Sequence, residues 1–310
     1  SALVEEHTLR FTNLNKVYFP EEKLTKRDLL AHYLRVGPYL LPMLEDRPMV
    51  LRRHPNGIHG EEFYQKEIGM EYPDWMPTVE IHSGTKGQAV KHYVTKGLAS
   101  LLFLTNLGCI EHNPWSSRAP SLETPDYVFF DLDPTDGTDF EVVLSVARHI
   151  LKLLQDLDVS VFVKTSGASG LHLFLPLEPV YSYDQTRMFA EVVARIAALE
   201  LGKLTTLERH VAKRNAGQVY LDYSQNAYGR PLASVYSVRP VVAASVSTPL
   251  LFQELNGKIS PSDFSIPVFA GQAEKRGAIW EPFWEQRQTL DGGLGRLGRL
   301  MQQAGRATQS

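Results

Sequence analysis

The chain has 310 residues, of which 43% are hydrophobic and 22% are charged, and its formal net charge is −3 at pH 7. This length allows one large domain or two modest ones with a sizeable core, and the near-neutral charge does not by itself indicate a nucleic-acid binder. Cys109 is the only cysteine, which excludes an intrachain disulfide and a cysteine-based zinc cluster.

Nothing in the sequence indicates a membrane protein. The opening residues SALVEEHTLR lack a basic segment followed by an apolar one, so we expect no signal peptide. No apolar run approaches the roughly 20 residues that a membrane-spanning helix requires. We therefore expect a soluble protein of a reducing compartment.

The first third of the chain predicts one long helix followed by short strands. Thr25 and Asp28 have the spacing of a capping box and open a helix rich in leucine and tyrosine, which Pro38 and Pro42 should break or kink. Residues 52–97 combine short alternating pieces with glycines and predict strands joined by loops. GLASLLFLTNLG has helical spacing, and CIEHNPW follows as a strand.

The middle of the chain interleaves strands and helices. Residues 127–133 predict a buried strand, and Thr138 with Glu141 predicts a capping box for the next amphipathic helix. VSVFVKT and LHLFLPL are strands joined by the short loop SGASG, which makes them antiparallel neighbours. A helix over YDQTRMFAEVVARIAALEL precedes strands at VYLDYS and ASVYSVRP. The pattern predicts a mixed α/β fold with largely antiparallel sheets flanked by helices.

The stretch YVFFDLDPTDG ends a hydrophobic strand with two aspartates, Asp131 and Asp133. Residues two apart on a strand point to the same face and lie about 6–7 Å apart along it. Two carboxylates at this spacing suit divalent cations held against a phosphate. The structural alternative is a solvated strand end at which Asp133 caps a turn.

A third carboxylate, Asp222, falls inside the predicted strand VYLDYS, where aspartate is disfavoured by propensity and by burial. The structural alternative is a salt-bridged sheet residue, with partners among Arg209, Lys213 and Arg214. Three strand carboxylates together favour a metal site over that alternative.

Two further groups have the chemistry of phosphate binding. In the predicted hairpin KTSGASGLHLFLPL, the loop amides of residues 166–170 suit a phosphate, and His172 lies on the following strand. Taken alone, such a loop and a single strand histidine are more often structural. A basic set with aromatic residues interleaved suits nucleic-acid ends, although a solvated charged loop explains it equally well. Its members are Lys16, Lys23, Lys26, Arg27, Arg52, Arg53, His54, Phe63 and Tyr64.

The order of these motifs resembles that of the archaeo-eukaryotic primase superfamily, and most of all the polymerase domain of bacterial ATP-dependent ligase D, which serves non-homologous end joining. The resemblance covers roughly residues 8–290. It includes FTNLNKVYFPEEKLTK, RRHPNG, EFYQKE, IEHNPW, VFFDLDP, KTSGASGLH, YLDYSQN and ASVYSVRP. It implies a single catalytic domain over residues 1–290, with a primase-polymerase-like core at about residues 100–245. The glycine-rich residues 291–310 are then expected to be a linker.

The resemblance also implies a role for each group. Asp131, Asp133 and Asp222 would be catalytic and would hold two divalent metal ions, Mn²⁺ preferred and Mg²⁺ as the alternative. Lys16 and Lys26 would bind the 5′-phosphate of a downstream strand. The nucleotide would be bound by Ser166, His172, Gln225, Arg239, His112, Asn13 and Lys164. The template strand would be contacted by Arg52, Arg53, Phe63 and Tyr64, where Tyr64 replaces the second phenylalanine common in the family and preserves stacking.

The function that the resemblance implies is extension of 3′-hydroxyl ends at DNA gaps and double-strand breaks, templated or not, with ribo- or deoxyribonucleoside triphosphates. Expected partners are gapped, nicked or broken DNA with a 5′-phosphate, a covalently linked ligase domain and a Ku-like end-binding protein. The expected location is the bacterial cytoplasm, at the nucleoid.

Two rival functions remain from the residues themselves. The D-x-D-x-T pattern also fits a haloacid dehalogenase-like phosphatase, with Asp131 as nucleophile and Asp133 as general acid. That fold, however, places the motif near its N-terminus. The second rival is a non-catalytic DNA-end-binding module, against which the three acids argue, because unused carboxylates at one point repel one another.

Overall fold

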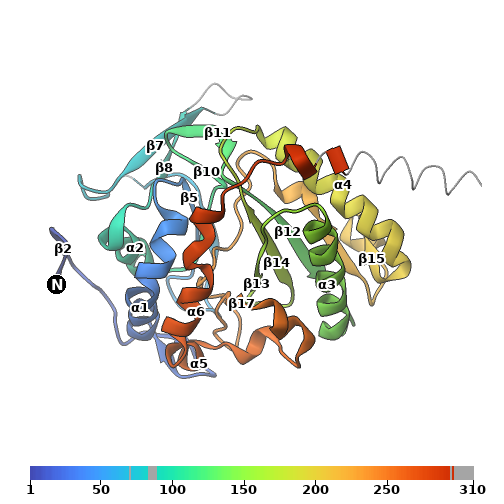
Figure 1. Cartoon of the computed structure of the whole chain (residues 1–310). Coiled ribbons are helices and arrows are strands. Elements are labelled where there is room, and N and C mark those ends of the chain that lie inside the picture. Colours follow the sequence, from blue (N-terminus) through green and yellow to red (C-terminus); the bar gives the residue numbers. More distant parts are fainter. Residues whose placement is uncertain (70, 83–88, 294, 297–310) are drawn as a thin grey trace, which may run out of the picture.

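A six-stranded sheet forms the centre of the molecule in the computed structural model, which describes residues 1–69, 71–82, 89–293 and 295–296 (Figure 1). The strand order is β15-β16-β12-β14-β13-β17, and every pair is antiparallel except β15 with β16. The predicted mixed α/β fold with largely antiparallel strands is therefore confirmed. The strands are β12 (Tyr127–Pro134), β13 (Phe162–Thr165), β14 (Leu171–Pro176), β15 (Thr205–Thr206), β16 (Val219–Asp222) and β17 (Pro249–Leu250).

Helices cover both faces of this sheet, and the alternation of side chains along β12 explains why. Val128, Phe130 and Leu132 point to one face and pack with α3 (Phe140–Asp156) and α4 (Tyr183–Leu201). Tyr127 and Phe129 point to the other face and belong to a second core cluster. This second cluster includes residues of α1 (Lys26–Leu44), α2 (Gly97–Asn106), α5 (Ile266–Ala270) and α6 (Ala273–Trp280), and Figure 1 shows α1 beside α6.

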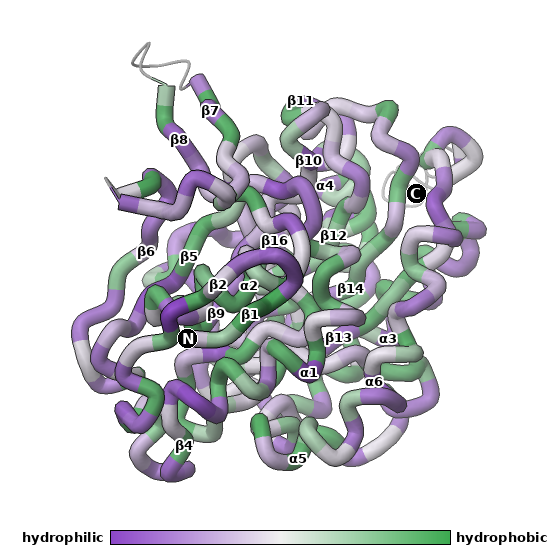
Figure 2. Tube along the Cα trace, turned by 90° about the vertical axis from the view of Figure 1, so that its left-hand side faces the viewer, coloured by the Kyte–Doolittle hydropathy of each residue, from purple (hydrophilic) through white to green (hydrophobic). Residues whose placement is uncertain are grey.

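The N-terminal third adds a smaller sheet of three antiparallel strands, in the order β6-β5-β9. Figure 2 shows the β7–β8 hairpin at the periphery of the molecule, with hydrophilic and hydrophobic segments in both strands. The remaining strands are β1 (Ala2–Val4), β2 (His7–Leu9), β3 (Val17–Phe19), β4 (Leu24–Thr25), β5 (Met49–Arg53), β6 (Phe63–Gln65), β7 (Thr78–His82), β8 (Ala89–Tyr93), β9 (Cys109–Pro114), β10 (Ser117–Arg118) and β11 (Ser121–Pro125). Short 3₁₀ helices are η1 (Gly202–Leu204), η2 (Val211–Lys213), η3 (Tyr223–Gln225), η4 (Phe252–Asn256), η5 (Pro261–Asp263) and η6 (Glu281–Gln286).

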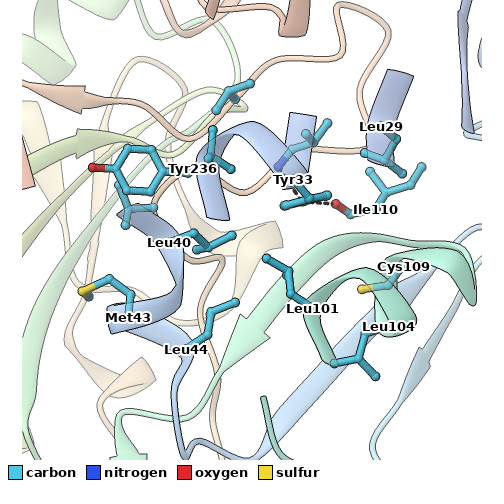
Figure 3. Close-up of a cluster of buried hydrophobic side chains, with 14 of the residues drawn as sticks. Leu29, Tyr33, Leu40, Met43, Leu44, Leu101, Leu104, Cys109, Ile110 and Tyr236 are labelled. Atoms are coloured by element: carbon cyan, nitrogen blue, oxygen red, sulfur yellow. Dashed lines mark hydrogen bonds between the residues drawn. The ribbon is translucent and has the colours of Figure 1, made fainter. Parts of the chain in front are cut away.

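The buried contacts of α1 fix the position of β9. Leu29, Leu40 and Leu101 are fully buried between α1 and α2, and the Tyr33 hydroxyl donates a 2.6 Å hydrogen bond to the Ile110 carbonyl (Figure 3). Satisfying that carbonyl inside the core ties β9 to the helix. Glu111, which follows Ile110, is consequently held in a fixed position at the edge of the small sheet.

The start of α1 agrees with the prediction and its course does not. Asp28 accepts a 2.7 Å hydrogen bond from the Thr25 amide, as a capping box requires. The helix is continuous through Pro38 and Pro42, so the predicted break is wrong. Each proline removes only one amide donor, and the fully buried Leu40 keeps that part of the helix packed against the core.

Two other local predictions are also wrong. The cap of α3 is Asp139, whose carboxylate accepts from the Glu141 amide, whereas the Thr138 hydroxyl donates to the carbonyls of neighbouring loops. The stretch ASVYSVRP is a turn with one isolated bridge from Val238, because Tyr236 has a φ of 64° that a strand does not allow.

Most of the predicted linker, together with Gly84 and Gly87, lies outside the described residues. Within the described part of the chain, no helix is both long enough and apolar enough to cross a membrane.

Candidate active site

Side chains of four neighbouring strands form one row across the central sheet. The register pairs Lys164 on β13 with His172 on β14, His172 with Asp131 on β12, and Asp131 with Asp222 on β16. Directly paired residues of antiparallel strands point to the same face, so all four share a face with Phe129. The hydrophobic run of β12 therefore ends in acids at the point where this face leaves the core.

Asp131 and His172 of this row line a cavity of about 460 Å³ between the central sheet and the small sheet, whereas Lys164 and Asp222 are not among its lining residues. Acids and cations both line it, which is the arrangement that a metal-bound polyphosphate requires. Its lining includes Tyr64, Lys66, Glu111, Asn113, Asp131, Asp133, Ser166, Ser169, His172, Gln225, Arg230 and Arg239.

The two aspartates of β12 are acids under electrostatic strain. Burial raises the pKa of Asp131 to about 6, against the opposing effect of Arg239, Lys164 and Arg214. Burial, followed by the charge of Asp131, raises the pKa of Asp133 to about 6 as well. Arg214 offsets this cost only partly, because its nearest guanidinium nitrogen lies 3.8 Å from Asp133 Oδ2. An additional cation between the two carboxylates would relieve this cost.

Asp222 lies at the end of β16 rather than inside a strand. Its Oδ1 atom accepts hydrogen bonds from the Ser224 amide at 3.0 Å and from the Ser224 hydroxyl at 2.6 Å. Arg214, one of the salt-bridge partners considered for Asp222, contacts Asp133 instead. Among the residues that the structure describes, no three histidine, cysteine, aspartate or glutamate side chains are grouped in a way that could hold a metal ion. The register brings Asp222 opposite Asp131, but its carboxylate is turned toward its own loop.

His172 and Lys164 form a buried relay behind Asp131. His172 Nε2 lies 3.2 Å from Asp131 Oδ1, and His172 Nδ1 lies 2.7 Å from Lys164 Nζ. Lys164 Nζ also donates to the Ala233 carbonyl and to the Ser247 hydroxyl oxygen. Lys164 is fully buried and does not line the cavity. It therefore holds His172 in place rather than facing a nucleotide.

The loop between β13 and β14 is shaped by glycine and by Ser166. Gly167 has a φ of 77°, and a Cβ on it would lie 2.6 Å from Arg239 Cγ, so only glycine lets the arginine pack here. The Ser166 hydroxyl oxygen accepts from the amides of Ala168 and Gly170. The Ser166 amide also donates to the Gly170 carbonyl, so three of the loop amides predicted to cradle a phosphate are already engaged. Arg239 adds a cationic donor on this side of the cavity.

Arg239 spans the cavity and reveals a residue that the sequence interpretation missed. Its Nε atom donates to Glu111 Oε2 at 2.8 Å and its Nη1 atom donates to the Ser166 carbonyl at 2.5 Å. Arg52 contacts the same Glu111 oxygen at 3.4 Å. Glu111 stands next to His112 in IEHNPW, and the alternation of that strand places the two on opposite faces without telling which of them meets the cavity.

The predicted nucleotide contacts separate into two groups. Ser166, His172, Gln225 and Arg239 line the cavity, whereas His112 and Asn13 are not among the lining residues. His112 is fully buried beside Thr105, and burial lowers its pKa to about 3, so the ring is neutral. Asn13 is exposed and its carbonyl accepts from the Lys16 amide.

Lys16 and Lys26, predicted to bind a 5′-phosphate, lie together at the start of α1. The Lys26 amide donates to the Lys16 carbonyl at 2.9 Å, so this helix amide is not free for an anion. Lys26 Nζ donates to the Asn106 carbonyl at 2.5 Å, and Lys16 Nζ to the Pro55 carbonyl at 3.0 Å. Burial, followed by the charges of Lys16 and Arg53, lowers the pKa of Lys26 to about 8. The charges of Lys16, Lys26 and Arg53 repel one another, and a bound dianion would offset this repulsion.

Phe63 and Tyr64 are neighbours on β6 and point to opposite faces. Phe63 is paired with Arg53, whose guanidinium lies 5.0 Å from its ring centre. Tyr64 is paired with Arg52, whose guanidinium lies 5.6 Å from its ring centre, and it lines the cavity. The Tyr64–Arg52 pair therefore lies on the cavity side of β6. The Phe63–Arg53 pair lies on the other side, near Lys26.

Comparison with known proteins identifies relatives of the whole chain. Residues 25–280 match the family model of the LigD primase-polymerase domain. The bifunctional non-homologous end joining protein LigD of Bacillus subtilis is 31% identical over 282 residues, which are 90% of this chain and 45% of that relative. The multifunctional non-homologous end joining protein LigD of Mycolicibacterium smegmatis is 30% identical over 250 residues, 80% of this chain and 32% of the relative. The chain thus spans less than half the length of these relatives.

A solved structure extends the similarity to the fold. The polymerase domain from Mycobacterium tuberculosis ligase D, in complex with DNA, matches with a TM-score of 0.83 and 25% sequence identity. The match covers 91% of this chain and 99% of that domain.

Proposed function

Because the chain belongs to the family of LigD primase-polymerase domains, we propose that it extends 3′-hydroxyl ends at DNA gaps and double-strand breaks. Domains of this family are nucleotidyltransferases of non-homologous end joining. The phosphatase alternative has no support left, since neither the family match nor the fold match is to a phosphatase.

One observation carries the proposal: the strained carboxylates Asp131 and Asp133 share a cavity with His172 and Arg239. Acids on one side and phosphate-binding donors on the other suit a triphosphate that arrives with divalent cations. A module that only binds DNA ends has no use for neighbouring acids whose pKa values are raised. The cavity of about 460 Å³ lies in the range of small-ligand pockets.

The donor set fits hard divalent cations, because the acids provide oxygen ligands only. Asp131 and Asp133 are the first proposed ligands, and Asp222 would be the third if its carboxylate were released from Ser224. Two bound cations, with Mn²⁺ preferred, would activate the 3′-hydroxyl and neutralise the leaving pyrophosphate.

The chain's own residues orient the nucleotide. Arg239 presents a planar fork whose Nε and Nη1 atoms are fixed by Glu111 and the Ser166 carbonyl, which directs the guanidinium toward the β- and γ-phosphates. His172, held by the buried Lys164, donates from Nε2 at the acidic end of the cavity. Gln225 lies at the end of η3, three residues after Asp222, and contributes a neutral polar contact.

The DNA end is bound on the small-sheet side. Lys16, Lys26 and Arg53 form the proposed pocket for the downstream 5′-phosphate, whose charge of close to −2 offsets their mutual repulsion. Phe63 faces the same side, and Tyr64 with Arg52 contacts the template strand at the cavity. The polymerase domain of Mycobacterium tuberculosis ligase D was solved in complex with DNA, which supports DNA as the ligand of this fold.

We also propose the surroundings of the domain, by analogy with its relatives. Residues 1–290 form a single catalytic domain of a longer protein that also carries a ligase activity. It acts on chromosomal DNA in the bacterial cytoplasm together with a Ku-like end-binding protein. Both ribo- and deoxyribonucleoside triphosphates are substrates.

Primer extension on gapped DNA tests the proposal, with Asp222→Asn compared with the unchanged chain and DNA affinity measured by fluorescence anisotropy. We expect extension to be lost while DNA affinity changes less than twofold. Extension by Asp222→Asn at an undiminished rate would remove Asp222 from the reaction.

A further inference from the structure

We propose that Glu111 is a positioning residue that couples the template side of the cavity to the triphosphate side, an inference that rests on the proposed function. Glu111 is only 3% exposed, and its Oε2 atom accepts hydrogen bonds from two guanidinium groups. Arg239 Nε lies 2.8 Å from this oxygen and Arg52 Nη1 lies 3.4 Å from it. One carboxylate oxygen therefore joins a template contact to a triphosphate contact.

The position of Glu111 follows from the register of the small sheet. Tyr64, Arg52 and Glu111 are paired in one row across β6, β5 and β9. On the other side, Arg239 reaches from Glu111 to the Ser166 carbonyl in the β13–β14 hairpin. The contacts thus run from the small sheet, across the cavity, to the central sheet. A shift of the template at Tyr64 or Arg52 is transmitted through Glu111 to Arg239.

Two of the five N–H donors of Arg239 are engaged, which leaves one on Nη1 and two on Nη2 for the ligand. Glu111 takes Nε and Ser166 takes Nη1, and within the described residues no hydrogen-bond partner takes Nη2. A guanidinium fixed at two donors keeps its plane, so its remaining donors point in one direction. Without the carboxylate, Arg239 is held by a single carbonyl and its plane is free to rotate.

Glutamine is the sharpest replacement, because it keeps the shape of Glu111 and removes its charge. A glutamine oxygen still accepts a charge-assisted hydrogen bond from a guanidinium, but the Coulomb attraction between the carboxylate and the two arginines is lost. We expect Glu111→Gln to raise the KM for the incoming nucleotide about tenfold through Arg239, and to weaken gapped-DNA binding several-fold through Arg52. The turnover number should change less than the KM, since Glu111 itself does not touch the reacting atoms.

The chain offers a matched control in Glu62. Glu62 Oε2 lies 2.9 Å from Arg52 Nη2, but the side chain is half exposed and has no contact with Arg239. Glu62→Gln therefore alters the same arginine without altering the link across the cavity. It should leave the nucleotide KM unchanged.

Two double-mutant cycles test the inference by single-nucleotide extension on gapped DNA and by DNA binding. Glu111→Gln is expected to have no further effect on nucleotide KM when Arg239 is already alanine, and none on DNA affinity when Arg52 is already alanine. Additive effects in both cycles overturn the coupling and leave Glu111 a packing residue. Should Glu111→Gln not fold, Glu111→Asp, which retains the charge but withdraws it by one methylene, enters the same cycles with the same expectation.

The proposed role of Arg239 and the proposed coupling through Glu111 can be refuted separately. An unchanged nucleotide KM in Arg239→Ala alone overturns the proposed role of Arg239, and the coupling with it. A raised KM in Arg239→Ala together with an unaffected KM in Glu111→Gln overturns the coupling alone.

Discussion

Replacing Asp131 with asparagine should stabilise the metal-free protein at neutral pH. The Asp131 side chain is 19% exposed, and burial raises its pKa to about 6, compared with about 3.9 in an unfolded chain. Between these values the folded state keeps a proton that the unfolded state releases, so stability falls as pH rises and the full cost is present above pH 6. Two pKa units correspond to at most about 3 kcal/mol. Asparagine removes this cost and its carbonyl still accepts from His172.

Thermal and urea unfolding in the presence of a chelator measure the effect. At pH 7.5 we expect Asp131→Asn to gain about 1–3 kcal/mol, a rise in Tm of several degrees, and the gain should shrink toward zero near pH 4. Asp126→Asn is the control, since Asp126 is a buried carboxylate paired with Arg47 at 2.6 Å and Arg118 at 2.8 Å, and its loss should cost about 3–5 kcal/mol. An Asp131→Asn variant that is less stable than the unchanged chain at pH 7.5 would refute the reasoning.

Three further predictions follow from the site. The pKa of about 8 at Lys26 means that the preference for a 5′-phosphate over a 5′-hydroxyl in DNA binding is greatest between about pH 7, where the phosphate is a dianion, and pH 8, and that it declines above pH 8 by at most about tenfold per pH unit; Lys26→Gln should show neither the preference nor this decline. Phe63→Ala should reduce that preference with little effect on nucleotide KM, and Tyr64→Ala should do the reverse; equal effects of the two variants on both quantities would contradict their placement on opposite faces. Lys164→Met should raise nucleotide KM and lower the free energy of unfolding in urea by about 1–3 kcal/mol. Ser247→Ala removes only one of the three contacts of Lys164 Nζ and should cost less; equal costs would contradict the proposed contact of Lys164 with His172.

Much of the central sheet could be predicted because period-two patterns report which face a residue occupies. Asp131 and Asp133 were expected on one face of a strand and lie there, and His172 was expected opposite its leucine neighbours and lies in the same row. The short loop between β13 and β14 predicts their antiparallel pairing, which is confirmed. These signals are local, so a single sequence contains them.

What could not be predicted depends on contacts between distant segments. Glu111 and its neighbour His112 differ only in which side of β9 meets the cavity, and that depends on the packing of β9 against α1 and β5. The burial of Lys26 comes from Asn106, eighty residues away. The place of Arg239 depends on a turn at Tyr236, where a non-glycine residue adopts a positive φ because the surrounding core requires it.

The sequence also contains information on Phe63 and Tyr64, which are both predicted to contact the template strand. Consecutive residues of a strand point to opposite faces, so the two side chains lie on different faces of β6. The alternation that identified the two aspartates, applied to β6, separates this pair.

The central claim is that the carboxylates beside Arg239 support templated nucleotide transfer to a 3′-hydroxyl. The most direct measurement is single-nucleotide incorporation on four gapped DNA substrates that differ only in the template base, with the unchanged chain and Asp131→Asn in parallel. The account predicts that the complementary nucleotide is added on each substrate by the unchanged chain, and that Asp131→Asn adds none while binding the DNA normally. Incorporation by Asp131→Asn at the rate of the unchanged chain, or no incorporation by either with intact DNA binding, would contradict it.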